Sequence, residues 1–159
     1  WGSDPNLVQG GLSLTAEAVT GDFEYARAAL VARVAVPLRA DMRLGLEAGA
    51  GKGWGGLTTQ RMWHLGGPSS LRGYDLRRLT GTSFVRARGE LARTYSFGSL
   101  SLFSDVAWAG ESESYHFEDA LYSVGVGLSL ADGLVRMDSA WGLRQPRAYR
   151  FDLYLDAIL

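Results

Sequence analysis

The chain has 159 residues, of which 47% are hydrophobic, so it is long enough for one domain and too apolar for the intrinsically disordered class. Its 16 Lys and Arg residues nearly balance its 17 Asp and Glu residues, and the net charge of −1 gives no electrostatic basis for binding nucleic acid. Cysteine is absent, which excludes disulfide scaffolds, thiol catalysis and zinc sites built on cysteine.

Hydropathy and glycine content narrow the class of protein further. No segment reaches the roughly 18 consecutive apolar residues of a transmembrane helix, but membrane β-barrels remain open because their strands are individually too weakly apolar to stand out. The chain has 21 glycines, only four prolines and 11% aromatic residues, which favours β structure. It starts without Met, so we expect that an export signal has been removed or that the chain begins inside a longer protein.

Apolar residues recur at every second position in eight segments, which is the period of a β-strand with one apolar and one polar face. In the first segment, for example, Leu12 and Leu14 alternate with Ser13, Thr15 and Glu17. The sequence therefore predicts an all-β, antiparallel fold in one domain over residues 1–159. The expected strands are about 8–20, 23–38, 42–54, 83–95, 99–109, 121–131, 134–143 and 149–158.

The connections between these segments alternate in length. Short turns are expected near 39–41, 96–98 and 131–133, and longer connections at 55–82, 110–120 and 144–148. Short turns on one side and long loops on the other are typical of membrane barrels. The tight turn at Gly21 and Asp22 is an exception, because it would lie on the side of the long loops.

Charged residues in the middle of the strands share the glycine-rich face. They are Arg27, Arg33, Arg43, Glu47, Arg86, Arg88, Glu90, Arg136 and Asp138. An Arg or Lys on the lipid face at the bilayer midplane costs roughly 2–4 kcal/mol, so in a bilayer this face must line a wet lumen. A soluble lipid-binding calyx could instead expose the same face to water, and the alternation alone leaves both readings open.

Aromatic residues gather near the strand ends. Four lie on the side of the long loops, at Trp54, Trp108, Trp141 and Tyr149. Tyr95 and Phe97 lie at the opposite rim. Two aromatic belts of this kind are typical of a protein that spans a membrane.

The segment 55–82 is exceptional, because loops of this length inside a compact fold are usually functional. A closed barrel of eight strands is just wide enough to be filled by its own side chains. Here the polar face is rich in Gly and Ser, which leaves room for the loop to fold inward. The sequence therefore favours one half of a larger barrel, with a small closed barrel as the alternative.

Motifs in and after this loop resemble the BamA/TamA/FhaC superfamily of outer-membrane barrel proteins, the bacterial surface antigen family. LGGPSSLRGYD, from Leu65 to Asp75, is similar to the family's inward-folding loop, whose core is Arg-Gly-Phe/Tyr. GELAR (89–93) and LFSDVAWAG (102–110) look like the two strands that follow it. ADGLVRMDSAWGLR and RFDLYLDAIL are similar to the last two strands, although the chain ends in Ala157-Ile158-Leu159 where the family usually ends in an aromatic residue.

The resemblance implies a fold, a location and a function. The chain would be the C-terminal eight strands of a transmembrane barrel of sixteen strands in the bacterial outer membrane. It would act in membrane protein assembly or protein transport, by inserting or translocating proteins. Its partners would be outer-membrane lipid, client polypeptides and upstream periplasmic domains, with no nucleic acid.

We expect a loop–barrel clamp formed by Arg72, Gly73, Tyr74, Glu90 and Asp105. Arg72 needs a partner if the loop enters the lumen, because a partly desolvated guanidinium is costly unless a carboxylate binds it. Glu90 and Asp105 lie on neighbouring strands and on the inward parity. Gly73 permits close approach of the backbone, and Tyr74 can stack on the wall.

Enzymatic readings receive little support from the residues. His64 and His116 are the only histidines, and they lie in different loops without metal-ligand spacing. Ser69 and Ser70 lie near His64, but no nucleophile elbow accompanies them. We therefore expect no catalytic residue, no cofactor and no metal, and we interpret the acidic segment SESESYHFED as a solvated outer loop. The alternative function is a structural barrel or the membrane anchor of a secreted enzyme.

Overall fold

A computed structural model describes residues 7–21, 24–111, 113, 115–131, 133–145 and 147–155. Eight long strands form one sheet in which every strand pairs antiparallel with its neighbours, in the order β1-β2-β3-β6-β7-β8-β9-β10. The all-β, antiparallel prediction is confirmed. The strands are β1 (Gln9–Val19), β2 (Tyr25–Arg39), β3 (Met42–Gly55), β6 (Ser83–Tyr95), β7 (Gly98–Gly110), β8 (Leu121–Leu130), β9 (Val135–Gly142) and β10 (Tyr149–Leu155).

Some sequence-based expectations fall outside the described residues. They include the end of the last expected strand, the terminal Ala157-Ile158-Leu159, and parts of the connections at 21–22, 110–120, 131–133 and 144–148. In the described part of 110–120, Phe117–Asp119 form a 3-10 turn. No helix in the described ranges is long and apolar enough to cross a membrane.

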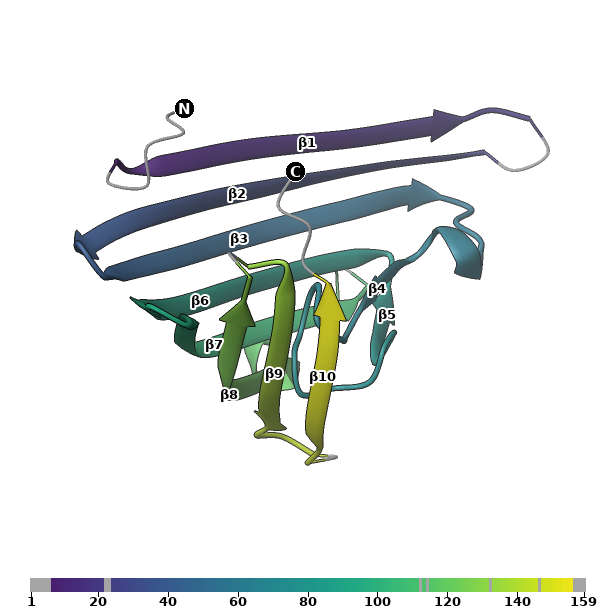
Figure 1. Cartoon of the computed structure of the whole chain (residues 1–159). Coiled ribbons are helices and arrows are strands. Elements are labelled where there is room, and N and C mark those ends of the chain that lie inside the picture. The colour runs from purple at the N-terminus through teal and green to yellow at the C-terminus, as the bar shows by residue number, and fades with distance from the viewer. Residues whose placement is uncertain are drawn as a thin grey trace.

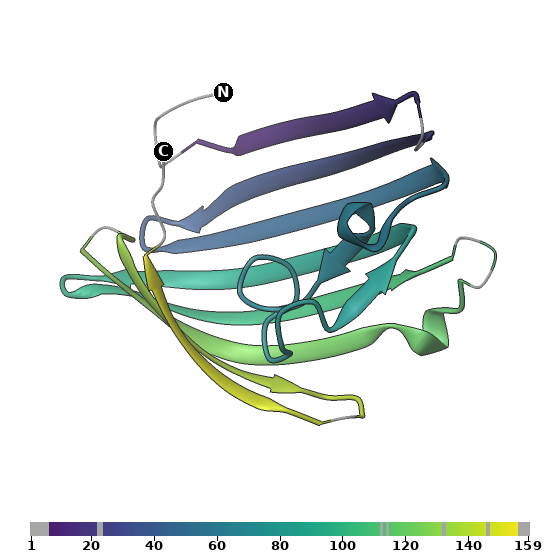
Figure 2. The same ribbon diagram turned by 90° about the vertical axis from the view of Figure 1, so that its right-hand side faces the viewer.

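The sheet is curved and open. Its two ends are β1 and β10, and the described residues of these strands do not pair with each other. Figures 1 and 2 show β8, β9 and β10 turning away from the direction of β1, β2 and β3, so that the sheet encloses a concave face. The described residues therefore form a half-cylinder and not the small closed barrel considered as an alternative.

The two faces of the sheet differ in polarity. Large apolar side chains on the convex face are exposed, among them Leu12 (68%), Leu102 (62%) and Leu153 (64%). A contiguous apolar surface of this kind is unusual in a water-soluble monomer and marks contact with lipid or with another protein. A soluble calyx would show the reverse arrangement, because its apolar face lines the interior.

The segment 56–82 lies against the concave face (Figure 2). It contains a 3-10 turn, η1 (Thr59–Arg61), and two short strands, β4 (Trp63–Leu65) and β5 (Leu79–Gly81), which pair antiparallel with each other. The prediction of one long loop at 55–82 missed these elements. Three-residue strands are too short to show an alternating pattern, and Gly55 belongs to β3.

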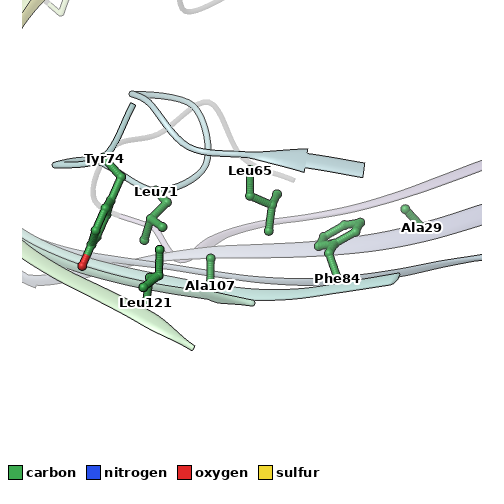
Figure 3. Packing of buried hydrophobic residues seen from close by; sticks show 7 residues of the cluster. All are labelled: Ala29, Leu65, Leu71, Tyr74, Phe84, Ala107 and Leu121. Atoms are coloured by element: carbon green, nitrogen blue, oxygen red, sulfur yellow. The ribbon is translucent and has the colours of Figure 1, made fainter. Parts of the chain in front are cut away.

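The buried apolar core lies between this loop and the concave wall (Figure 3). From the loop come Leu65, Leu71 and Tyr74, and from the wall come Ala29, Phe84, Ala107 and Leu121. Trp63 adds a tilted contact with Phe84, with 4.9 Å between ring centroids. The core of this chain therefore depends on the loop, because the convex face buries no comparable cluster among the described residues.

Three of the four aromatic side chains expected at the long-loop rim are exposed, since Trp54, Trp141 and Tyr149 have exposed fractions of 49%, 46% and 58%. Trp108 differs from this expectation, because Tyr115 packs edge-on against it and only 6% of it is exposed. Two aromatics also lie exposed at the short-turn rim, Tyr95 and Phe97, whose rings stack with 5.4 Å between centroids.

Candidate functional site

The loop forms a compact turn around Ser70. The hydroxyl of Ser70 accepts a hydrogen bond from the Gly66 amide at 2.8 Å and donates one to the Gly66 carbonyl at 3.0 Å. The amide of Leu71 donates to the carbonyl of Gly67, whose own amide donates to the carbonyl of Tyr74, each over 3.1 Å. These bonds close the segment 66–74 on itself and direct the next side chain, Arg72, at the wall of the sheet.

Arg72 is only 2% exposed and binds two carboxylates on neighbouring strands. Its Nε and Nη2 donate to the two oxygens of Asp105 at 2.8 and 2.7 Å, and its backbone amide donates to Asp105 at 3.0 Å. Its Nη1 donates to Glu90 Oε2 at 2.9 Å. A bidentate guanidinium–carboxylate pair is among the strongest polar contacts in proteins, and here the loop backbone adds a third bond to the same carboxylate.

Residues from β7, β9 and β10 complete this site. The guanidinium of Arg72 lies 3.4 Å from the ring centroid of Phe103, and its Nη1 lies 3.7 Å from Asp138 Oδ2. Arg136 donates to both oxygens of Glu90 at 2.9 and 2.6 Å and to Asp138 at 3.0 Å. The hydroxyl of Tyr154 donates to Asp138 at 2.7 Å. We call the set of Arg72, Phe103, Glu90, Asp105, Arg136, Asp138 and Tyr154 the Arg72 cluster.

The charges of the Arg72 cluster are balanced. Its two arginines face three carboxylates, and the balance is completed by Arg88, which lies outside the defined set and 3.4 Å from Asp105. Buried charges are tolerated when each is paired and hydrogen-bonded, and they become costly when one partner is removed. The cluster is therefore a self-neutralising attachment with no charge left for a ligand.

Four residues of the Arg72 cluster were not among the expected clamp residues. Phe103, Arg136 and Asp138 showed the inward parity in the sequence, and so did Tyr154, which alternates with the apolar residues of its strand. Parity could not show that β9 and β10 curve over the loop, because sheet curvature is not encoded in the period of the pattern. The sequence offered one signal for these residues, which was that Arg136 and Asp138 lie two positions apart on the same inward face.

Gly73 and Tyr74 fit against the end of β9. Gly73 has a φ of 83°, and a Cβ there would lie 3.1 Å from the backbone nitrogen of Gly142. A Cβ on Gly142 would in turn lie 2.6 Å from Cζ of Tyr74, so only glycine leaves space for the ring. The Tyr74 hydroxyl accepts from the Arg144 amide at 3.0 Å and lies 3.1 Å from the carbonyl of Tyr122, to which it donates.

The tip of the loop is held through its backbone. Arg88 donates to the carbonyls of Pro68 and Ser69 at 2.9 and 3.1 Å, and Arg86 donates to the carbonyl of Ser69 at 3.1 Å. Any side chain at these two loop positions would offer the same carbonyls. The motif therefore needs no particular residue at 68 or 69 for these contacts.

A second attachment joins the start of the loop to β1 and β2. Glu17 accepts hydrogen bonds from the Tyr25 hydroxyl at 2.6 Å and from Arg27 Nε at 2.7 Å, and it lies 3.2 Å from Arg61 Nη1. Arg27 also donates to the carbonyl of Arg61 at 3.1 Å. We call Glu17, Tyr25, Arg27 and Arg61 the Glu17 cluster. Sequence reasoning missed it, since Arg61 lies in the loop with no strand parity.

The residues considered for enzymatic roles have structural contacts. His64 lies 3.0 Å from the Thr80 hydroxyl and 3.1 Å from the Thr59 carbonyl, which links β4 to β5 and η1. The hydroxyl of Ser70 is hydrogen-bonded to the backbone amide and carbonyl of Gly66. Within the described ranges, no group of three or more His, Cys, Asp or Glu residues is arranged to hold a metal ion.

Comparison with known proteins shows a likeness of fold. No protein-family model and no curated protein matches the sequence. Among solved structures, the crystal structure of BamA from Haemophilus ducreyi lacking POTRA domains 1–3 matches with a TM-score of 0.81 and 14% sequence identity. The match covers 96% of this chain and 39% of that chain, so this chain spans well under half of the BamA chain. The resemblance suggested by the sequence motifs is confirmed at the level of fold.

Proposed function

We propose that this chain is the C-terminal half of a transmembrane β-barrel of the bacterial outer membrane that inserts or translocates proteins. Upstream strands of the same protein complete the barrel by pairing with β1 and β10. The convex apolar face meets lipid, and the charged concave face lines the lumen. The role is non-enzymatic, and the partners are client polypeptides together with periplasmic domains upstream of the barrel.

The observation that carries the proposal is the burial of Arg72 between the loop and the charged wall. A passive anchor needs only a lipid-facing surface, and nothing in that role requires a loop fixed inside the barrel by a buried guanidinium. A loop whose most deeply buried charged side chain is held by carboxylates of the wall gives the barrel an ordered internal element. The likeness of fold to BamA supports the same role.

Reconstitution of the full-length protein into liposomes tests the proposal. We expect the liposomes to speed the membrane insertion of an unfolded client barrel relative to protein-free liposomes. In Arg72→Ala the loop should detach from the wall, and most of this acceleration should be lost. The barrel itself should stay embedded in the membrane. Arg93→Ala is the matched control, since Arg93 binds Asp41 outside the lumen at 2.7 Å.

Two outcomes would contradict the proposal. One is insertion no faster than in protein-free liposomes, which would favour the anchoring barrel. The other is a loop in Arg72→Ala that remains as resistant to protease as in the parent protein.

A further inference from the structure

A cavity of about 950 Å³ lies on the concave face, beside the tip of the loop. Its charged lining comes from β2, β3, β6, β9 and the loop, and comprises Arg33, Arg43, Glu47, Arg72, Arg88, Glu90 and Arg136. Glycines on the same face, such as Gly11 and Gly45, leave the space that these side chains border. The cavity adjoins the Arg72 cluster but extends away from it toward β1.

Positive charge exceeds negative charge on the β2–β3 side of this cavity. Glu47 is shared by two guanidiniums, Arg33 at 2.5 Å and Arg86 at 2.8 Å. Arg43 donates to the neutral side-chain oxygen of Gln9 at 2.5 Å, and no carboxylate of the described residues lies within ion-pair distance of it. Two lining arginines, Arg33 and Arg43, therefore stand against one lining carboxylate, Glu47, which Arg86 binds as well.

Hydrogen-bond donors are also in excess here. The side chain of Arg33 is 60% exposed, and the atom that binds Glu47 is its Nε. A guanidinium carries five N–H donors and no acceptor, so the exposed donors of Arg33 can bind oxygen atoms of a ligand or of solvent. Charge and donor count therefore point to the same ligand chemistry, which is a carboxylate or another oxyanion.

The spacing of the arginines distinguishes a long ligand from a single small anion. Arg33 is paired in register with Glu47 on β3, and Arg43 lies four residues away along β3. Four residues of an antiparallel strand span about 14 Å, which is too far for one carboxylate to bridge and matches acidic side chains four positions apart in an extended peptide.

We infer that this cavity binds an acidic, extended polypeptide segment, whose carboxylates meet Arg43 at one end and Arg33 at the other. The inference rests on the proposed function and deepens it, since it assigns a chemical preference to the polypeptide that the barrel handles. The Arg72 cluster holds the loop, and the arginine-rich wall beside it holds the client segment.

Fluorescence anisotropy with the full-length protein in detergent micelles tests this site. The probe is a labelled ten-residue peptide with Glu at every fourth position, and the matched peptide has Gln at those positions. We expect the Glu peptide to bind at least about tenfold more tightly than the Gln peptide. Arg43→Gln should weaken binding of the Glu peptide about tenfold, which is the usual contribution of one charged hydrogen bond to affinity. Arg93→Gln, which removes a cation outside the lumen, should leave the affinity unchanged.

Equal affinity for the two peptides, or an equal loss in Arg43→Gln and Arg93→Gln, would overturn the inference. Displacement of the peptide by equimolar inorganic phosphate at constant ionic strength would also overturn it, because the site would then take free anions. Client insertion into liposomes separates this result from the proposed function. Peptide binding that depends on Arg43, without accelerated insertion, would support the site and contradict the insertion role.

Discussion

The loop is attached to the sheet at two places that use the same chemistry in different surroundings. In the Arg72 cluster, the side chains of Arg72 and Asp105 are 2% and 0% exposed. Arg72 lies within ion-pair distance of carboxylates on β6, β7 and β9. In the Glu17 cluster, the side chains of Arg27, Glu17 and Arg61 are 22%, 26% and 50% exposed. Ion pairs in contact with water contribute little, whereas a buried pair makes the removal of one partner costly. The comparison indicates that the Arg72 cluster contributes most of the free energy that holds the loop on the sheet, and that the Glu17 cluster contributes little.

The largest effect is expected for Asp105→Ala. This change leaves the guanidinium of Arg72 buried without its bidentate partner, and removal of one member of a buried pair costs about 3–5 kcal/mol. The free energy of unfolding, measured by urea titration in detergent, should fall by that amount. Asp41→Ala, which removes the exposed partner of Arg93, should change it by less than about 1 kcal/mol. A loss in Asp105→Ala no larger than in Asp41→Ala would contradict the contrast between buried and exposed pairs.

Leu102→Arg tests the assignment of the two faces. Leu102 is 62% exposed in the middle of β7, on the convex face. Arginine at the bilayer midplane costs about 2–4 kcal/mol, so unfolding from lipid vesicles should become easier by that amount. Ser13 is exposed on the polar face in the middle of β1, and Ser13→Arg serves as the control for adding a charge away from the lipid face. A vesicle stability that does not change in Leu102→Arg would show that this face does not meet lipid.

Tyr74→Phe should have an intermediate effect. The ring still fits against Gly142, but the Arg144 amide loses the hydroxyl to which it donates, whereas the Tyr122 carbonyl keeps the Leu143 amide as a donor. Leaving buried polar groups unsatisfied costs about 1–3 kcal/mol, which we expect as a loss in the same urea titration. If Tyr74→Phe is as stable as the parent protein, the hydroxyl contributes nothing and only ring packing fixes this end of the loop.

The smallest effect is expected for Glu17→Gln. The amide keeps the shape of the side chain but removes the charge that faces Arg27 and Arg61 and replaces one acceptor oxygen with an NH2 donor. Limited trypsin digestion should cut after Arg61 faster than in the parent protein, because the start of the loop is less restrained. Protection after Arg72 should not change. Increased cutting after Arg72 as well would show that the two attachments are coupled.

The sequence predicted the wall better than it predicted the loop. Period-two alternation located the eight strands and placed Glu90 and Asp105 on the face that meets Arg72, because parity depends only on local residue order. The short β4–β5 pair and the Glu17 cluster have no such period. The contribution of Phe103, Asp138 and Tyr154 depends on how strongly the sheet curves, and curvature results from the packing of all strands together.

Cysteine labelling measures most directly whether Arg72 holds the loop in place. The chain contains no cysteine, so Ser70→Cys introduces a single thiol at a position that is 5% exposed, and Leu76→Cys provides a control at 69% exposure. In the full-length protein in liposomes, we expect a water-soluble maleimide to label Leu76→Cys rapidly and Ser70→Cys slowly. Adding Arg72→Ala should raise the labelling rate of Ser70→Cys toward that of Leu76→Cys. An unchanged rate at Ser70→Cys after the loss of Arg72 would contradict the account.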